Sequence, residues 1–455
     1  MTNVLLVTID SLRRDHVGCY GYERNTTPVI DDLAEGGLYF DAFANANWTR
    51  ASFPSIITST YPLEYGGFEY LADKRTTVGT AVGEAGHATG AFHSNLWLSR
   101  DYNYDRGFDR FYDSKSDPSI LSRLRSWVKL NVDHDSLLYR TLQRLYDTTE
   151  EQAGLDVGQT YKDAAEITEE AIDWIAGVDG PFFCWVHYMD VHHPYLPHEE
   201  AAAALGLDLG LGERDAIKLR RKMLEDPDEL SEEEFCTLLD LYDAEIRYTD
   251  DQIGRLLDTV DRSFDAEDTA VVVTSDHGEE FDDHGGFSHN PSMYDEVLSV
   301  PLVVSGAGAV SETASTGHQP ELVELLDVAP TCVDLAGGEI PEGYRGRSLL
   351  EAATPGTDAR LIAETDQADE YKLALRTREW KFIWDRDAGT RELYNLVDDP
   401  GEREEVSVAH PDIAADLERE LADHLSDLRQ TNEALPEPDM DVQTKQRLRD
   451  LGYLS

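Results

Sequence analysis

The chain has 455 residues, of which 41% are hydrophobic, and it carries a formal net charge of −52. This length and apolar content predict a folded protein with a large core and exclude an intrinsically disordered chain. The acidic excess excludes nucleic acid as a partner, because phosphate binding needs a basic surface. Two explanations of the charge stay open, an acidic face for a cationic partner and adaptation to a cytoplasm of high salt. The second is favoured, because concentrated salt screens the repulsion.

The four cysteines are widely spaced, so they indicate neither a disulfide framework nor a zinc ribbon. The sequence has no apolar run of about 18 residues that would predict a transmembrane helix. The opening apolar run at 4–9 is too short for the core of a signal peptide. We therefore expect a cytoplasmic protein without a transmembrane segment, and the oligomeric state stays open.

Apolar runs typical of buried strands alternate with stretches of helical periodicity along most of the chain. Strands are expected at 4–9, 88–93, 182–187, 270–275 and 301–304, and helices at 27–35, 161–175 and 231–260. This alternation predicts an α/β fold in which helices cover both faces of a sheet.

Two helical insertions interrupt the alternation, at about 117–149 and 199–230. The first has leucines at helical spacing and is either a packing hairpin or a lid over a substrate. Beyond the turn-rich stretch 341–358, short alternating runs predict antiparallel strands, and an amphipathic helix is expected at about 411–429. We expect a large domain over 1–358 and a smaller C-terminal α+β subdomain over 359–455.

Carboxylates follow two of the predicted strands. The run 269–275 leads directly into Asp276 and His277, and the run 4–9 leads into Asp10. Ligands bind at the carboxyl ends of strands in α/β sheets, so these three side chains are candidate ligands of one divalent metal ion. Helix capping is the alternative role for Asp10. The Asp-His dipeptide occurs five times in this acidic chain, so its position after a strand carries the prediction.

An ordered series of motifs resembles the sulfatase family of the alkaline-phosphatase superfamily. It runs from Asn-Val-Leu-Leu-Val-Thr-Ile-Asp at 3–10 through Gly-Cys-Tyr-Gly-Tyr at 18–22, Tyr-Met-Asp-Val-His-His-Pro-Tyr at 188–195 and Ser-Asp-His-Gly-Glu at 275–279 to Glu-Leu-Tyr-Asn-Leu at 392–396. The resemblance implies a large mixed, mainly parallel sheet and a catalytic domain that hydrolyses sulfate or phosphate esters. The acidic composition indicates a member of halophilic-archaeal type.

The nucleophile of sulfatases lies in a C/S-x-P-S-R motif, and its Cys or Ser is oxidised to formylglycine. Counting back from Thr58 and Ser59, which match the end of the nucleophile helix, gives Thr49. A second register gives Ser52, but it lacks the arginine and needs a three-residue deletion. Threonine cannot form the formylglycine aldehyde, because its β-carbon carries a methyl group. A metal-activated threonine hydroxyl instead suits attack on phosphorus, so Thr49 favours phosphoesters. A purely structural role, capping of the helix, is the alternative for either hydroxyl.

The same resemblance assigns roles to basic side chains. His192 and His289 would bind the ester or protonate the leaving group, because imidazole titrates near neutral pH. Arg50 would bind the ester oxygens, with a surface ion pair as the alternative. We expect His187 to be a core histidine of its strand.

The metal site implied by the resemblance departs from the calcium sulfatases at Ser11, where those enzymes carry a second Asp. This favours one ion, which could be Ca²⁺, Mn²⁺, Mg²⁺ or Zn²⁺. The ligand set is Asp10, Thr49, Asp276 and His277. Asp190, His192 and His289 could supply a second set, so a two-metal site stays open.

The leading hypothesis is a metal-dependent hydrolase acting on a small-molecule, glycan or lipid ester. One alternative is a phosphoglycerol-type transferase acting on a glycan or lipid alcohol, which the same site would permit. Another is a metal-binding scaffold without turnover.

Overall fold

The computed structural model describes residues 1–113, 161–264, 268–289, 291–309, 316–350, 359–367, 370–431 and 434–435. The helical insertion expected at 117–149 lies outside these residues. None of the helices within the described ranges combines the length and the apolar character that crossing a membrane requires.

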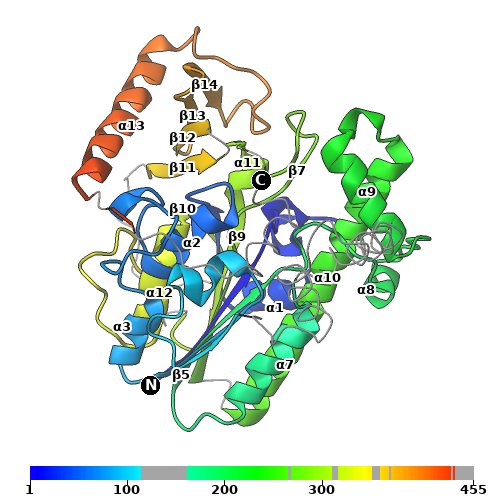
Figure 1. The fold of residues 1–455 in the computed structure, drawn as a ribbon, viewed down its shortest axis with the longest axis vertical. Coiled ribbons are helices and arrows are strands. Elements are labelled where there is room, and N and C mark those ends of the chain that lie inside the picture. Colours follow the sequence, from blue (N-terminus) through cyan, green and yellow to red (C-terminus); the bar gives the residue numbers. More distant parts are fainter. Residues whose placement is uncertain are drawn as a thin grey trace, which may run out of the picture.

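A mixed sheet of eight strands occupies the centre of the described chain (Figure 1). In spatial order the strands are β10 (Gly317–Glu324), β2 (Leu38–Phe43), β9 (Ser299–Gly306), β6 (Thr269–Ser275), β1 (Asn3–Ile9), β5 (Phe182–Tyr188), β3 (Ala88–Phe92) and β4 (Arg110–Tyr112). β9 runs antiparallel to both of its neighbours, and the other pairs are parallel. The predicted mixed, mainly parallel sheet is confirmed.

Helices cover both faces of this sheet (Figure 1). One face carries α1 (Pro28–Gly36), α7 (Ala164–Ile175) and α10 (Glu232–Ser263), and the other carries α2 (Thr49–Thr58), α3 (Val78–Glu84) and α12 (Val328–Leu335). In β1, Val4 and Leu6 enter the core beneath the second set of helices, whereas Leu5 and Val7 enter the core beneath the first. Burial on both faces explains why the central strands are continuous apolar runs.

A second, antiparallel sheet follows in the C-terminal part. It consists of β11 (Leu361–Gln367), β12 (Glu370–Arg376), β13 (Trp380–Asp385) and β14 (Thr390–Asn395). Helix α13 (Pro411–Thr431) covers one face through Leu417, Leu421 and Leu425. Ala363 and Ala374 on the other face join the core of the large sheet. Residues 351–358, where we expected the domain boundary, lie outside the described ranges.

The remaining elements are short. They are α8 (Glu199–Ala204), α9 (Glu213–Glu225), α11 (Asp295–Leu298), the hairpin β7 (Glu280–Phe281) with β8 (Phe287–Ser288), and the 3₁₀ turns Arg14–His16, Gly18–Tyr20, Glu64–Gly66, Leu96–Leu98, Arg100–Tyr102, Pro227–Glu229 and Leu325–Asp327. Helices α8 and α9 lie within the insertion expected at 199–230. A capping box of Ser231 and Glu234 then starts α10.

Strand register decides which side chains meet at the edge of the large sheet. β1 lies between β6 and β5 and is parallel to both. Ile9 is paired with Ser275 on one side and with Tyr188 on the other. The residues that follow these three strands therefore emerge side by side at the carboxyl edge, where α/β proteins hold their ligands.

Candidate active site

Asp10, Asp276 and His277 lie together at this edge, and we refer to them as the carboxylate group. All three are fully buried, and each offers a ligand atom within 4.8 Å of the others. His277 Nε2 is 3.7 Å from Asp10 Oδ1 and 3.6 Å from Asp276 Oδ2. The three ligands predicted from the strand ends are thus brought together by the pairing of β1 with β6.

Hydrogen bonds orient the carboxylate group toward a common centre. His277 Nδ1 donates to the carbonyl of Gly278 (2.7 Å), so the neutral ring presents the lone pair of Nε2 to the carboxylates. The backbone amides of Ser11 and His277 donate to Asp276 Oδ1. Asp276 Oδ2 is buried and has no hydrogen-bond partner among the described residues. Such an oxygen is costly unless a cation satisfies it, so these residues fit a metal ion.

The pKa values in the carboxylate group also favour a bound cation. Burial raises the pKa of Asp10, but the contact with His187 and the charges of His192 and His277 outweigh burial and hold this pKa well below its usual range. Burial and the charge of Asp10 raise the pKa of Asp276 well above its usual range. Burial lowers the pKa of His277 to about 3. Two adjacent buried carboxylates need a cation before both can be ionised.

Thr49 is the first residue of α2 and faces the carboxylate group. Its Oγ1 donates to Asp10 Oδ2 at 3.2 Å and lies 3.4 Å from His277 Nε2. Ser52, the alternative nucleophile, lies one turn further along α2. Its hydroxyl is directed to the backbone carbonyls of Asp276 (2.7 Å) and Ala46 (3.0 Å). Of the two hydroxyls, that of Thr49 therefore contacts the carboxylate group.

Two further side chains hold Asp10. His187, which we expected to be a core histidine, is buried in β5, and its Nε2 lies 3.4 Å from Asp10 Oδ2. Asn95 Nδ2 donates to the same oxygen at 3.4 Å. The available signal in the sequence was the position of His187 at the end of the strand expected at 182–187. No signal in the sequence indicated Asn95, because it lies in the irregular segment after β3.

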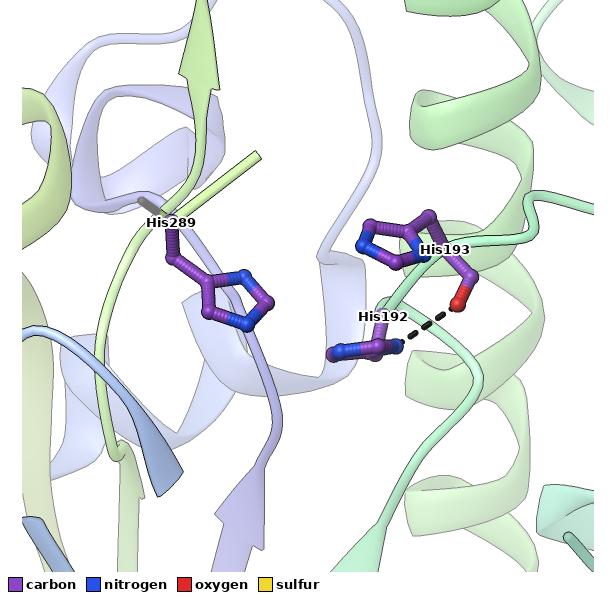
Figure 2. Close-up of side chains that lie close together, drawn as sticks. All are labelled: His192, His193 and His289. Atoms are coloured by element: carbon purple, nitrogen blue, oxygen red, sulfur yellow. Dashed lines mark hydrogen bonds between the residues drawn. The ribbon is translucent and has the colours of Figure 1, made fainter. Parts of the chain in front are cut away.

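His192, His193 and His289 form a second cluster beside the carboxylate group, and we call it the histidine group (Figure 2). The ring of His289 faces the other two rings, with centroids 5.1 Å from His192 and 5.8 Å from His193. It also lies 4.5 Å from the ring of His277, which joins the two groups. His192 Nδ1 donates to the carbonyl of His193 at 2.7 Å. The structure therefore places both histidines that the resemblance assigned to the ester beside the carboxylate group.

Glu279 supports the histidine group and was not singled out from the sequence. One of its carboxylate oxygens accepts a hydrogen bond from His289 Nδ1 (3.3 Å), and the other accepts one from the phenol of Tyr195 (2.8 Å). Burial raises the pKa of Glu279 to about 7 and lowers that of His289 to about 4. The position of Glu279 within Ser-Asp-His-Gly-Glu was the available signal.

The second ligand set considered from the sequence is not assembled in the described residues. Asp190 lies near His198 and Glu245 instead of His192 and His289. His193 is also unsuited to a metal ion. Arg220 Nε donates to its Nδ1 (3.1 Å), so Nε2 carries the proton and donates to Ser288 Oγ (3.0 Å).

Arg50 follows Thr49 in the sequence, but its guanidinium forms an ion pair with Glu69. Its Nη2 pairs with the carboxylate of Glu69 at 2.5 Å and donates to the carbonyl of the same residue at 2.9 Å. The guanidinium lies over the ring of Trp97, 4.2 Å from the centroid. Contact between Arg50 and an ester would therefore have to compete with Glu69.

Comparisons with known proteins agree on one family. The sulfatase family model matches residues 2–338, and the model of the C-terminal region of N-sulphoglucosamine sulphohydrolase matches residues 282–431. The chain is 24% identical to the uncharacterized sulfatase YidJ of Escherichia coli over 94% of this chain and 88% of that one. It is 29% identical to mouse arylsulfatase K over 42% of this chain and 36% of that one.

Solved structures share the fold at low sequence identity. The phosphonate monoester hydrolase of Agrobacterium radiobacter has a TM-score of 0.68 at 18% identity, covering 94% of this chain and 96% of its own. A protein solved with its substrate D-glucosamine-2-N,6-O-disulfate has a TM-score of 0.69 at 17% identity, covering 97% of this chain and 100% of its own.

Proposed function

The chain belongs to the sulfatase family of sulfuric and phosphoric ester hydrolases. We propose that it is metal-dependent, that Thr49 is its nucleophile and that it prefers phosphate esters. The observation that carries the proposal is the position of Thr49 Oγ1, 3.2 Å from Asp10 and 3.4 Å from His277 at the start of α2. A helix N-terminus also favours an anionic ester, because its free amides point outward.

Asp10, Asp276 and His277 would hold the metal ion, and their oxygen-rich set with one nitrogen suits Mn²⁺, Zn²⁺, Mg²⁺ or Ca²⁺. The bound ion would lower the pKa of the Thr49 hydroxyl and offset the negative charge of the ester. His277 keeps its Nε2 lone pair available because Nδ1 donates to Gly278.

The reaction we propose has two steps. Thr49 Oγ1 attacks phosphorus, an ester bond to Thr49 forms, and the bond to the leaving oxygen breaks. His192 or His289 takes the proton of the Thr49 hydroxyl and gives it to that oxygen. In the second step the same histidine takes a proton from the attacking water and returns it to Thr49 Oγ1 as the bond between phosphorus and Thr49 breaks. Binding of the ester by Arg50 stays a prediction, and it requires that the pair with Glu69 open.

Phosphorus is favoured because Thr49 cannot supply the aldehyde chemistry of formylglycine sulfatases. Among the similar solved structures, one acts on phosphonate monoesters and another was solved with a sulfated glucosamine, so the fold accommodates both kinds of ester. A small-molecule, glycan or lipid phosphoester is the substrate class that we propose.

Purified protein assayed with p-nitrophenyl phosphate, bis-p-nitrophenyl phosphate and p-nitrophenyl sulfate, with and without added metal, tests the proposal. We expect metal-dependent phosphoesterase activity that Thr49→Ala abolishes and Ser52→Ala retains. Sulfatase activity that survives Thr49→Ala but not Ser52→Ala would reject Thr49. Circular dichroism checks that Ser52→Ala folds, because its hydroxyl contacts two buried carbonyls. Transfer to glycerol in place of water would identify a transferase, and metal binding without turnover would identify a scaffold.

We also propose that the acidic composition is an adaptation to high salt. A net charge of −52 destabilises the compact state by self-repulsion, and salt shortens its range. The midpoint of thermal unfolding is therefore expected to rise as KCl increases from about 0.1 to about 3 M, where the screening length falls to roughly 3 Å or less. Sorbitol of equal osmolality is the control, and an equal rise with sorbitol would refute a charge effect.

A further inference from the structure

A second cluster of metal-ligating side chains lies outside the site described above. Asp190 follows β5, His198 precedes α8, and Glu245 lies in α10. Each offers a ligand atom within 4.8 Å of the other two. We propose that Asp190, His198 and Glu245 bind a second divalent transition-metal ion, such as Zn²⁺ or Mn²⁺, in a structural role.

A buried oxygen without a hydrogen-bond partner marks this cluster as a candidate site for a cation. Asp190 is 2% exposed, and its Oδ1 accepts a hydrogen bond from the amide of Ala164 (2.9 Å). Its Oδ2 has no partner in the part of the chain that the structure describes. Glu245 is 1% exposed, and its Oε1 accepts a hydrogen bond from the amide of Leu196. Both carboxylates are thus held from one side by the backbone. The second oxygen of Asp190 is left for a cation, and that of Glu245 faces His198.

The spacing of the ligand atoms suits one ion. His198 Nε2 lies 2.8 Å from Glu245 Oε2. Two ligands bound to the same ion at roughly 2.1 Å each are about 3 Å apart. The ring of His198 lies flat on that of Tyr248, with centroids 3.8 Å apart and planes inclined by 10°, which fixes its orientation. His198 and Glu245 therefore already have the spacing of two ligands of one ion.

The charge balance also favours a cation. Burial raises the pKa of Asp190 well above its usual range, and it raises that of Glu245. Burial lowers the pKa of His198, but the charge of Glu245 and the hydrogen bond to it raise this pKa overall to about 9. One imidazolium thus faces two buried carboxylates, so a divalent ion in place of its proton would neutralise both.

The donor set selects among ions. One imidazole nitrogen with two carboxylate oxygens suits Zn²⁺ or Mn²⁺ better than Ca²⁺, which prefers oxygen ligands alone. The side chain of His198 is 23% exposed, so an ion can reach the cluster from solvent.

Such an ion would tie together three separate segments: the loop after β5, the start of α8 and the middle of α10. Asp190 lies two residues before His192, so the same loop carries His192 and His193. The ion would therefore help to position His192 and His193. This consequence rests on the proposed function, whereas metal binding at the cluster does not.

Metal content tests the inference directly. The full chain is dialysed against Zn²⁺ or Mn²⁺ and then against metal-free buffer, and bound metal is measured by elemental analysis. We expect two ions per chain in the wild type, one in His198→Asn, one in Asp276→Asn and none in the double variant. His410→Asn, which changes an exposed histidine, is the matched control and is expected to keep two.

The outcomes separate the two sites. One ion in the wild type, lost in Asp276→Asn and kept in His198→Asn, overturns the second site. One ion lost only in His198→Asn supports the second site and rejects the metal proposed at the carboxylate group. Glu245→Gln provides a second variant if His198→Asn fails to fold. Added Zn²⁺ is expected to raise the thermal midpoint of Asp276→Asn, and no rise in the double variant attributes this shift to the cluster.

Discussion

The carboxylate group and the histidine group lie side by side, but the fold builds them differently. Asp10 and Asp276 are fixed by the ends of two adjacent strands, and Thr49 begins a helix. His192 and His289 stand on loops. A group fixed by the sheet suits chemistry common to a family, whereas loops vary and adapt a shared site to different substrates. We therefore propose that the carboxylate group binds the metal ion beside the attacking Thr49, and that His192 and His289 contact the ester and its leaving group.

Removing a carboxylate is expected to have the largest effect. Asp276→Asn leaves the shape of the site but removes one negative ligand charge. Loss of the ion forfeits several kcal/mol of transition-state stabilisation, so kcat/KM is expected to fall by about 10³-fold or more. Steady-state kinetics with p-nitrophenyl phosphate and elemental analysis of the variant measure the two effects.

Asp250→Asn is the matched control for this variant. Asp250 is fully buried as well, but it accepts hydrogen bonds from the amides of Val29 and Ile30 at the start of α1. We expect lower stability with unchanged metal content. Equal loss of metal in both variants would mean that general destabilisation, and not ligation, explains the result for Asp276.

Variants of the histidine group are expected to lose less activity, by an amount that depends on the leaving group. A general acid contributes roughly 10²–10⁴-fold, and a leaving group that departs easily needs it least. His192→Asn and His289→Asn should therefore lose about 10²-fold with an alkyl phosphate and markedly less with p-nitrophenyl phosphate. Metal content should stay unchanged. His318→Asn, which changes an exposed residue of the edge strand β10, is the control. Equal losses for both substrates would contradict leaving-group protonation.

The sheet was the part of the fold most open to prediction from sequence. The central strands are buried on both faces, so their apolar runs stand out, and β1, β3, β5, β6 and β9 were anticipated. β2, β4, β10 and β11 were not. β10 lies at an edge with alternating exposure, and Pro320 interrupts its apolar pattern, so it resembles a loop. Burial on only one side weakens the signal of a strand.

The same contrast holds for the site. Asp10, Asp276 and His277 could be predicted to lie together because they come within two residues of the ends of β1 and β6, where the topology determines position. Asn95 and Glu279 could not be given roles, because their contacts depend on loop conformations that no local pattern determines. Arg220 belongs to an insertion helix, and its contact with His193 depends on how α9 packs.

The low pKa of His289 is expected to make the free energy of unfolding depend on pH. The pKa of His289 is about 4 in the folded chain, below its ordinary value of 6.5. Between these values the unfolded chain binds a proton that the folded chain does not, so the free energy of unfolding falls as pH falls, by at most about 1.4 kcal/mol per pH unit. In metal-free buffer with a chelator, the free energy of unfolding of His289→Asn should fall less steeply with falling pH than that of the wild type. Urea unfolding at pH 7, 6 and 5 measures it, and parallel curves would refute the prediction.

Arg220→Gln is expected to have the smallest effect. Arg220 Nε fixes the tautomer of His193, which in turn donates to Ser288 beside His289. Glutamine keeps a donor but loses the positive charge, so the histidine group should stay assembled with a weaker attraction for an anionic ester. We expect KM to rise a few-fold at nearly constant kcat, because the contact does not reach the reacting atoms. Arg221→Gln, on the same helix and paired with Glu225, is the control. A fall in kcat as large as that of His192→Asn would place Arg220 in the chemical step. The proposal that loop residues position the ester while residues at the sheet edge carry out the chemistry would then be wrong.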